Sequence, residues 1–406
     1  VSYGDRVWDV VAQIYFGFPE FFRSVFGNRA ALLATHYSVY GVGVYLFMRF
    51  KKHSRFVSFF TAFAAVFSTS VVAWMFKGHN SKIVAFSMLP YIFMLIEMLR
   101  EKFTLLKLTF LVIVLHIMFA SNHIQIIYYS LIAYILYFIF EIIARAMKKE
   151  KIKSVLYSGV GLAVAGIIAF SMYADRYFSI LEYTPHSTRG KGPIVKSEDT
   201  QRTKGGGNSY DYATGWSFSP EEMMTFFVPN YFGFGKLEYS GPETRGQDVK
   251  IMTYWGQKAF EDEASYMGIA VLIFAIIGVV LYRRNPFVLF LTVLSVFALI
   301  MSFGKNFSIL YDLFYYYAPM FNKFRVPSMI LLLVQFSVPI LAGYGLTGMM
   351  KWRNELPEKG KKILNGTLGF SIAFLIIGFL FSAIFKDTYI SAVASSDTGS
   401  RLPASI

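Results

Sequence analysis

Two short polar turns carry the residues of this chain that are best suited to chemistry. The first is the segment 77–82, with the sequence KGHNSK, and the second is the segment 121–125, with the sequence SNHIQ. Each turn holds a histidine among lysine or amide side chains, and such donors suit an anion, a phosphate above all. The alternative is that these polar residues only satisfy helix ends, and for either turn alone the two interpretations stand equal.

Further basic residues favour a binding surface. Arg189 lies in a long polar segment, and the segment 322–325 has the sequence NKFR. Lysine meets a phosphate as a point charge and arginine as a planar fork, and a lipid-linked phosphate would fit both. The alternative for Lys323 and Arg325 is that they only extend toward lipid headgroups. The predicted phosphate contacts are His79, Lys82, His123, Arg189, Lys323 and Arg325.

Carboxylates for acid–base chemistry are harder to select, because their spacing singles out no pair. Asp211 lies in the aromatic segment 211–216 (DYATGW), where an acid can bind sugar hydroxyls while a ring stacks on the apolar face of the sugar. The alternative is an Asp that caps a loop. Glu221 and Glu222 follow Ser219 and Pro220, and we expect them to cap a helix start.

Membrane helices must position these side chains. Hydrophobic residues make up 55% of the chain and charged residues 16%, a balance typical of a polytopic membrane protein. Ten apolar segments each approach the roughly 20 residues that a membrane helix needs. They are residues 30–50, 56–76, 83–99, 104–120, 125–144, 155–174, 265–282, 286–303, 327–349 and 363–385.

Lysine and arginine are concentrated in alternate turns. The basic turns lie near residues 50–55, 100–107, 145–153, 283–284 and 351–362, and the turns between them are poor in basic residues. The positive-inside rule therefore places the basic turns in the cytoplasm and both histidine turns outside. The net charge of +14 reflects anchoring to anionic lipid, which argues against a nucleic-acid surface.

The apolar pattern divides the chain into five parts. They are the end of an outer loop (1–28), transmembrane helices (29–174), a large extracytoplasmic loop (175–264), further transmembrane helices (265–385) and the start of a C-terminal outer segment (386–406). We expect at least one helix upstream of Val1.

Several local expectations accompany this division. We expect flexibility near 187–207, an aromatic segment 210–232 that folds onto the helix ends, and a short amphipathic helix within 303–326. Within the bundle, we expect solvent access at Glu97 and Glu141, and we expect His116 and Gln335 to tie helices together.

Cofactor motifs do not occur in the sequence. The chain has no cysteine, which excludes disulfides and thiolate metal sites. It also has no P-loop, GxSxG elbow, HExxH or CxxC motif. We therefore predict no cofactor, and a dependence on a divalent metal stays open.

An ordered series of motifs resembles a known family. The series runs GHNSK (78–82), ASNHIQ (120–125), YY (128–129), TRG (188–190), DYATGWS (211–217), PN (229–230), YWGQ (254–257) and NKFR (322–325). In order and spacing, along most of residues 70–345, it closely resembles the YfhO-type family of bacterial membrane proteins.

The resemblance implies an all-α polytopic membrane protein with a GT-C-like helical bundle and extracytoplasmic loops. Its place would be the bacterial cytoplasmic membrane, and its activity the transfer of a sugar from a polyprenyl-phosphate donor to an outer acceptor. The catalytic acid would lie in the first outer loop, which makes Asp5 and Asp9 candidates beside Asp211, unless the base lies upstream of Val1. Implied sugar or acceptor contacts are Asn80, Asn122, Gln125, Trp216, Asn230, Trp255 and Gln257.

Two alternatives keep this fold and change the function. One is a flippase or transporter for a lipid-linked precursor, which would need discontinuous helices. The other is a non-catalytic membrane subunit with protein partners in a larger complex. Membrane lipid is an expected partner for all three functions, and a lipid-linked sugar is expected for the glycosyltransferase and for the flippase.

Overall fold

The chain is largely helical in a computed structural model that describes residues 29–187, 208–233, 235–241, 244–258, 261, 265–352, 357–384 and 386–396. The α-helices are α2 (Arg29–Phe50), α3 (Arg55–Val66), α4 (Thr69–Phe76), α5 (Asn80–Ser87), α6 (Leu89–Glu101), α7 (Leu105–Ala120), α8 (Ile124–Met147), α9 (Lys153–Ser171), α10 (Ala174–Tyr183), α11 (Tyr210–Thr214), α12 (Ile269–Tyr282), α13 (Pro286–Ser302), α14 (Ser308–Tyr317), α15 (Leu332–Lys351), α16 (Glu358–Ile384) and α17 (Lys386–Ser395). Short 3-10 helices are η2 (Thr184–His186), η3 (Glu221–Phe226), η5 (Gly304–Phe307), η6 (Phe321–Lys323) and η7 (Pro327–Leu331).

One element departs from the all-α prediction. Strands β1 (Lys236–Tyr239) and β2 (Val249–Met252) pair as an antiparallel hairpin, with Lys236 opposite Met252. Each strand has only four residues and is largely exposed, and an alternation of polar and apolar side chains as short as Lys236–Tyr239 does not distinguish a strand from a loop in a sequence.

The apolar helices make this chain a multi-pass membrane protein. Within the described ranges, five helical segments are long and apolar enough to cross a membrane, or up to seven if each of two bent pairs is one span. The five are Asn80–Glu101, Ile124–Met147, Lys153–Ser171, Pro327–Lys351 and Gly360–Gly378.

Within the residues that the structure describes, five of the ten predicted spans do not form a single helix that is long and apolar enough to cross a membrane; they correspond to α2, to α3 with α4, and to α7, α12 and α13. Helices α7 and α12 contain only 16 and 14 residues. The predicted span 56–76 is divided into α3 and α4, which are bent by 53°. A continuous apolar stretch cannot reveal such a break, because hydropathy measures composition and not direction.

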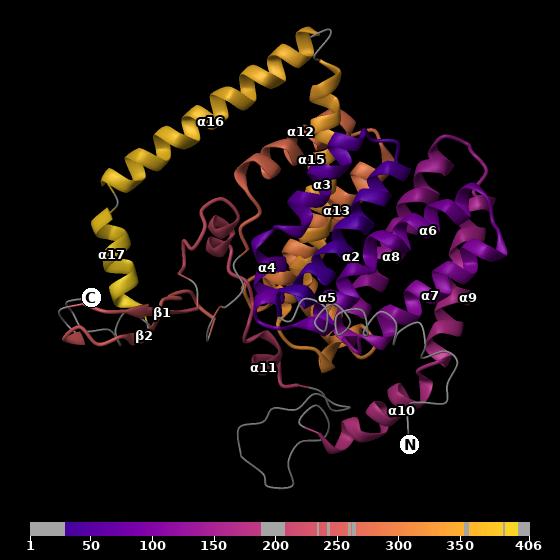
Figure 1. The fold of residues 1–406 in the computed structure, drawn as a ribbon, viewed down its shortest axis with the longest axis horizontal. Helices are drawn as coiled ribbons and strands as arrows, with labels where there is room; N and C mark the ends of the chain where they lie inside the picture. Colours follow the sequence, from indigo (N-terminus) through magenta and orange to yellow (C-terminus); the bar gives the residue numbers. More distant parts are fainter. Residues whose placement is uncertain are drawn as a thin grey trace.

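Helix α15 forms the centre of the bundle (Figure 1). Of its most apolar window, 89% is buried, against 6% for α16, which stands apart from the bundle in Figure 1. The closest helix packing is between α12 and α15, where a Cβ atom on Gly345 would lie 1.9 Å from the backbone oxygen of Phe274. Glycine at this position therefore lets the two backbones approach.

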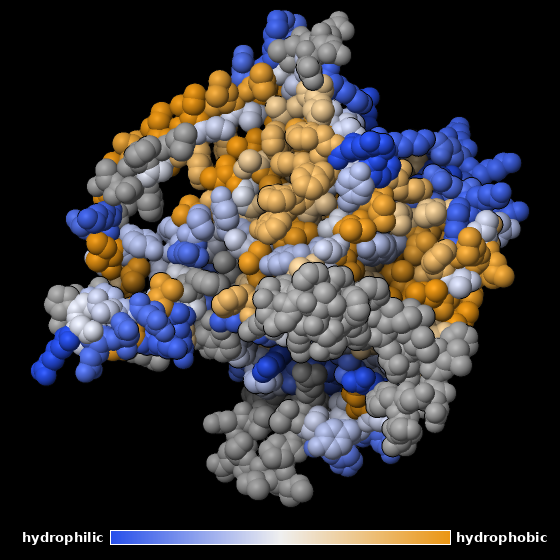
Figure 2. Space-filling view, in the orientation of Figure 1, coloured by the Kyte–Doolittle hydropathy of each residue, from blue (hydrophilic) through white to orange (hydrophobic). Residues whose placement is uncertain are grey.

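Basic turns gather at one end of the bundle, which we call the basic end (residues 49–55, 97–107, 141–153, 282–284 and 351). Lys51 pairs with Glu97 at 3.0 Å, and Arg100 bridges Glu97 to Glu141. Lys351 lies over the ring of Tyr282, at 5.8 Å from its centroid. Figure 2 shows hydrophilic side chains along the upper and right-hand edges, above an apolar band. The basic turns that alternate along the sequence thus lie together at one end of the fold.

The carboxylates at the basic end are not solvated as the sequence suggested. Glu97 and Glu141 are 2% and 7% exposed, and both contact Arg100. The expectation of solvent access is therefore wrong, because arginine replaces water as the partner of both carboxylates. Deeper in the bundle, Gln335 donates a hydrogen bond to Ser70 at 3.0 Å, which confirms that it ties two helices together.

Aromatic segments cover the opposite end of the bundle. The backbone N–H of Phe218 donates to the oxygen of Ser302 at 2.8 Å, which confirms that 210–232 folds onto the helix ends. Helix α14 follows α13 after a bend of 110°, so the short helix expected within 303–326 is present. Most of the segment 187–207, which we expected to be flexible, lies outside the described residues.

Candidate functional site

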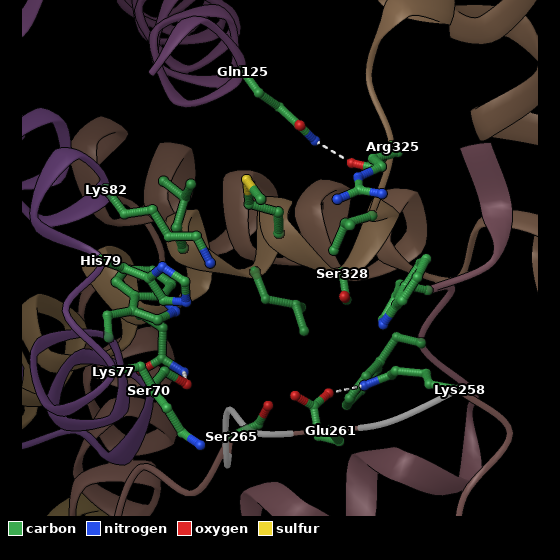
Figure 3. Close-up of a pocket in the computed structure, with 18 of the residues that line it drawn as sticks. Ser70, Lys77, His79, Lys82, Gln125, Lys258, Glu261, Ser265, Arg325 and Ser328 are labelled. Atoms are coloured by element: carbon green, nitrogen blue, oxygen red, sulfur yellow. Dashed lines mark hydrogen bonds and ion pairs between the residues drawn. The ribbon is translucent and has the colours of Figure 1, made fainter. Parts of the chain in front are cut away.

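A cavity of about 400 Å³ lies at the end of the bundle opposite the basic end. Figure 3 shows residues that line it. Both histidine turns reach it, as does the segment that begins at Arg325. Three walls surround it, formed by the turn between α4 and α5, by the chain around Arg325, and by Lys258, Glu261 and Ser265. Its lining combines basic side chains with two tryptophans, Trp74 and Trp216.

The first wall is the turn between α4 and α5 together with the first turn of α5, and it carries Lys77, His79 and Lys82. Helix α4 ends at this turn because Gly78 takes a left-handed conformation with φ 79°, a common way to end a helix. The next helix begins at Asn80, so three donors come within one short stretch. Lys82 lies over the ring of Trp74, at 5.6 Å from its centroid, and in Figure 3 its ammonium group is directed into the cavity.

The second wall is built around Arg325. Asn208 fixes the preceding residues, because its amide donates to the oxygens of Lys323 and Phe324, each at 3.0 Å. Gln125 donates to the backbone oxygen of Arg325 at 2.7 Å and so joins the second histidine turn to this wall. The segment 322–325 is therefore held by backbone contacts that leave the arginine side chain to face the cavity.

The Arg325 guanidinium contacts only neutral groups in the described part of the chain. It donates to the hydroxyl of Tyr212 and lies over the ring of Trp216, at 5.6 Å from the centroid. No described carboxylate lies within ion-pair distance of it. Its charge therefore remains available to an anion in the cavity.

The third wall contains a buried charged cluster of Lys258, Glu222 and Glu261. The Lys258 ammonium lies 3.1 Å from Glu222 and also pairs with Glu261. Burial alone would lower the pKa of Lys258, but the two carboxylates outweigh burial and hold the pKa above its usual value. Lys258 is therefore a permanent cation, and Glu261 projects from it toward the cavity (Figure 3).

The position of Glu222 confirms the predicted cap. Its carboxylate accepts from the N–H of Ser219 at 2.8 Å, and its own N–H donates to the Ser219 hydroxyl at 3.2 Å. This reciprocal pair is a capping box at the start of η3. The same carboxylate also accepts a hydrogen bond from the Tyr254 hydroxyl at 2.7 Å, and burial followed by Glu222 raises the pKa of that phenol.

Positive charge dominates the cavity. Lys77, Lys82, Lys258 and Arg325 line it, whereas Glu261 is the one carboxylate among the lining residues that the structure describes. Histidines His79 and His123 add further hydrogen-bond donors. Within the described ranges, no group of three His, Asp or Glu residues is placed to hold a metal ion. The arrangement favours binding of an anion such as a phosphate group.

Sequence-predicted residues divide between the cavity and its supports. His79, Lys82, His123, Gln125, Trp216 and Arg325 line the cavity. The residues that do not line it are Asn80, Asn122, Lys323, Asp211, Asn230, Trp255 and Gln257. Asp5, Asp9 and Arg189 lie outside the described residues.

The non-lining residues have other positions. Gln257 donates to the backbone oxygen of Ser217 at 2.9 Å, beside the tryptophan of the second wall. Trp255 donates to the oxygen of Tyr231 at 3.2 Å, and Asn230 borders a separate cavity of about 20 Å³. Asp211 is exposed in the first turn of α11. Gln257 thus holds the segment next to Trp216, although it does not itself line the cavity.

Sequence reasoning missed the third wall. The sequence signal for Lys258 is weak, because a lone lysine in a polar loop resembles any solvated residue. The spacing of the carboxylates does not distinguish Glu261 from the other acids, and Lys77 is only one of several polar residues in the first histidine turn. A lysine directly after an aromatic motif, YWGQ at 254–257, was the available hint of burial.

Comparison of the chain with known protein families, with curated proteins and with solved structures finds no match.

Proposed function

We propose that this protein is a GT-C-like glycosyltransferase of the YfhO type, and that the cavity binds the phosphate of a polyprenyl-phosphate sugar. The observation that carries the proposal is the gathering of four basic side chains around one cavity at an end of a membrane bundle. A lipid phosphate at the membrane boundary is the anion that such a position meets most readily.

We infer the side of the membrane from the basic turns. They gather at the basic end, so the positive-inside rule assigns that end to the cytoplasm and the cavity to the outside. For a bacterial protein this means the outer side of the cytoplasmic membrane. A donor presented there would transfer its sugar to an extracytoplasmic acceptor.

The cavity residues fit distinct parts of such a donor. Arg325 offers a planar fork to two phosphate oxygens, while Lys82 and Lys77 act as point charges from the opposite wall. Trp216 offers an aromatic face for a sugar ring. The cations would stabilise the negative charge that develops on the phosphate as its bond to the sugar breaks.

Binding and transfer test this proposal separately. Undecaprenyl phosphate in detergent should quench the fluorescence of the purified protein, since Trp74 and Trp216 line the cavity. Undecaprenyl-phosphate sugars should release undecaprenyl phosphate when an acceptor is present. R325A and H79A should reduce both signals at least about tenfold.

Lys323 provides a matched control. It lies two residues from Arg325 in the same segment but does not line the cavity, so K323A should keep binding close to that of the wild type. Turnover in R325A and H79A equal to the wild type would refute the site.

Flipping of a lipid-linked precursor is a second candidate, favoured by one observation. Helices α3 and α4 form a pair bent by 53°, and Ser70 directly after the break lines the cavity and accepts from Gln335. Broken helices of this kind occur at substrate sites of transporters. In proteoliposomes, movement of labelled undecaprenyl-phosphate sugar across the bilayer without cleavage would favour flipping over transfer.

A further inference from the structure

The cavity contains one described carboxylate, and its place in the site is not explained by phosphate binding. Glu261 points into the cavity from the third wall, across from His79 and Lys82 (Figure 3). Its side chain is 20% exposed, so it reaches the open space while remaining held by the wall. A carboxylate there would repel a phosphate unless it served another part of the reaction.

The surroundings of Glu261 fix it in one orientation. Its carboxylate pairs with Lys258, whose side chain is only 2% exposed and which also lies 3.1 Å from Glu222. Glu222 is itself held by Ser219 and Tyr254, at 2.8 and 2.7 Å. The Glu222 contact to the Lys258 ammonium is therefore backed by two further hydrogen bonds, and the backbone oxygen of Glu261 accepts from the N–H of Gly235 at 2.8 Å, which keeps Glu261 at a defined place.

The charge of this cluster suits a group that takes up a proton. With Glu261 ionised, two carboxylates share one ammonium group. When Glu261 is protonated, Lys258 and Glu222 remain as a neutral pair, so no buried charge is left without a partner. The second carboxylate thus makes the protonated state of Glu261 electrostatically acceptable.

We propose that Glu261 is the catalytic base of the transfer reaction. This inference rests on the proposed glycosyltransferase function. Glu261 accepts the proton of the acceptor hydroxyl while the acceptor oxygen forms a bond to the anomeric carbon of the sugar. The bond between that carbon and the phosphate oxygen breaks, and its electron pair stays on the phosphate, facing Arg325 and Lys82. In this proposal the catalytic base is Glu261, whereas the family resemblance places the base in the first outer loop.

E261Q is the direct test, because glutamine keeps the shape of the side chain and removes the base. Transfer from an undecaprenyl-phosphate sugar should fall about 100-fold or more. The affinity for undecaprenyl phosphate should stay within about threefold of the wild type, since the cations are unchanged. Glu221 is exposed and does not line the cavity, so E221Q is the matched control and should leave both quantities unchanged.

Three results would overturn the assignment. The first is transfer by E261Q within about threefold of the wild type, and the second is an equal loss of transfer and of affinity, which indicates a binding role. The third concerns E261D, which keeps a carboxylate beside Lys258 and should transfer more sugar than E261Q, so the reverse order would contradict a base. A wild-type protein that binds undecaprenyl phosphate but transfers no sugar would instead refute the proposed function.

Discussion

The two ends of the bundle use the same kinds of residues in opposite ways. At the basic end, Arg100 lies between two buried carboxylates, Glu97 and Glu141. At the cavity end, Arg325 faces open space and touches only the neutral rings of Tyr212 and Trp216 in the described part of the chain. One arginine is satisfied within the fold, and the other is available to a ligand.

Because of this difference, charged residues at the basic end stabilise the fold, whereas Arg325 at the cavity end is available for binding. A charge with buried internal partners holds helices together, since losing one partner leaves the other stranded in a medium of low dielectric constant. A charge without such a partner adds little to folding and repels its neighbours until an anion arrives. Substitutions at the basic end should therefore change the free energy of unfolding, and substitutions at the cavity end should change affinity.

Removal of Arg100 should have the largest effect on stability. R100M leaves Glu97 and Glu141 buried without their shared cation, and the free energy of unfolding should fall by about 3 kcal/mol. Thermal unfolding in detergent measures this loss. The comparable change at the cavity end, R325M, should change the free energy of unfolding by less than about 1 kcal/mol.

Lys148 supplies the surface control for that experiment. It is exposed at the end of α8, so K148M should stay within about 0.5 kcal/mol of the wild type. If R100M and R325M proved equally stable, the arginines at the two ends would not differ in their contribution to folding.

Much of the fold can be predicted from the sequence, because apolar stretches indicate membrane helices and basic residues indicate the turns at one membrane surface. Apolar stretches mark helices such as α8 and α15, and the basic turns do gather at one end. The break between α3 and α4 is not readable, since Phe67 and Ser68 interrupt neither length nor composition. The hairpin of β1 and β2 was also missed.

The cavity was readable where its residues form short motifs. His79, Lys82, His123 and Arg325 were selected because each stands in a compact polar group between apolar helices. Lys258 was not, because its role depends on Glu222, which is distant in the sequence, and on burial by the folded loop. Some motif residues do not line the cavity, namely Asn230, Trp255 and Gln257. Trp255 and Gln257 instead donate hydrogen bonds to backbone oxygens, because a sequence motif does not show which of its side chains faces the cavity.

Lowering the pH should lower the free energy of unfolding through His53 at the basic end, by an amount that is intermediate among these predictions. His53 lies in the turn before α3, where burial, followed by the charges of Lys51 and Lys351, lowers its pKa to about 4. The folded pKa lies below the ordinary value of about 6.5, so protons favour the unfolded chain. The contribution of His53 to stability is thus complete above about pH 6.5 and is lost as the pH falls toward 4.

Thermal unfolding at two pH values measures this effect. Between about pH 7 and pH 5, the wild type should lose on the order of 2 kcal/mol through His53. H53N should lose less, because asparagine can keep the contact that Nδ1 makes with Thr347 at 2.6 Å but does not titrate. H79N, at the exposed turn of the cavity, should retain the wild-type pH dependence, and an unchanged slope in H53N would contradict the assignment.

Salt should produce the smallest effect, and it should act at the cavity alone. Lys77 and Arg325 are exposed to water, so added ions screen their attraction for a phosphate. Raising NaCl from about 0.05 to 0.5 M should weaken undecaprenyl phosphate binding by about threefold. The melting temperature should change little, because the pairs around Arg100 are buried and poorly screened.

K82M should bind undecaprenyl phosphate more weakly and show a smaller salt dependence, since one of the screened charges is gone. Equal salt dependence in K82M and wild type would show that Lys82 does not contribute to the field of the cavity.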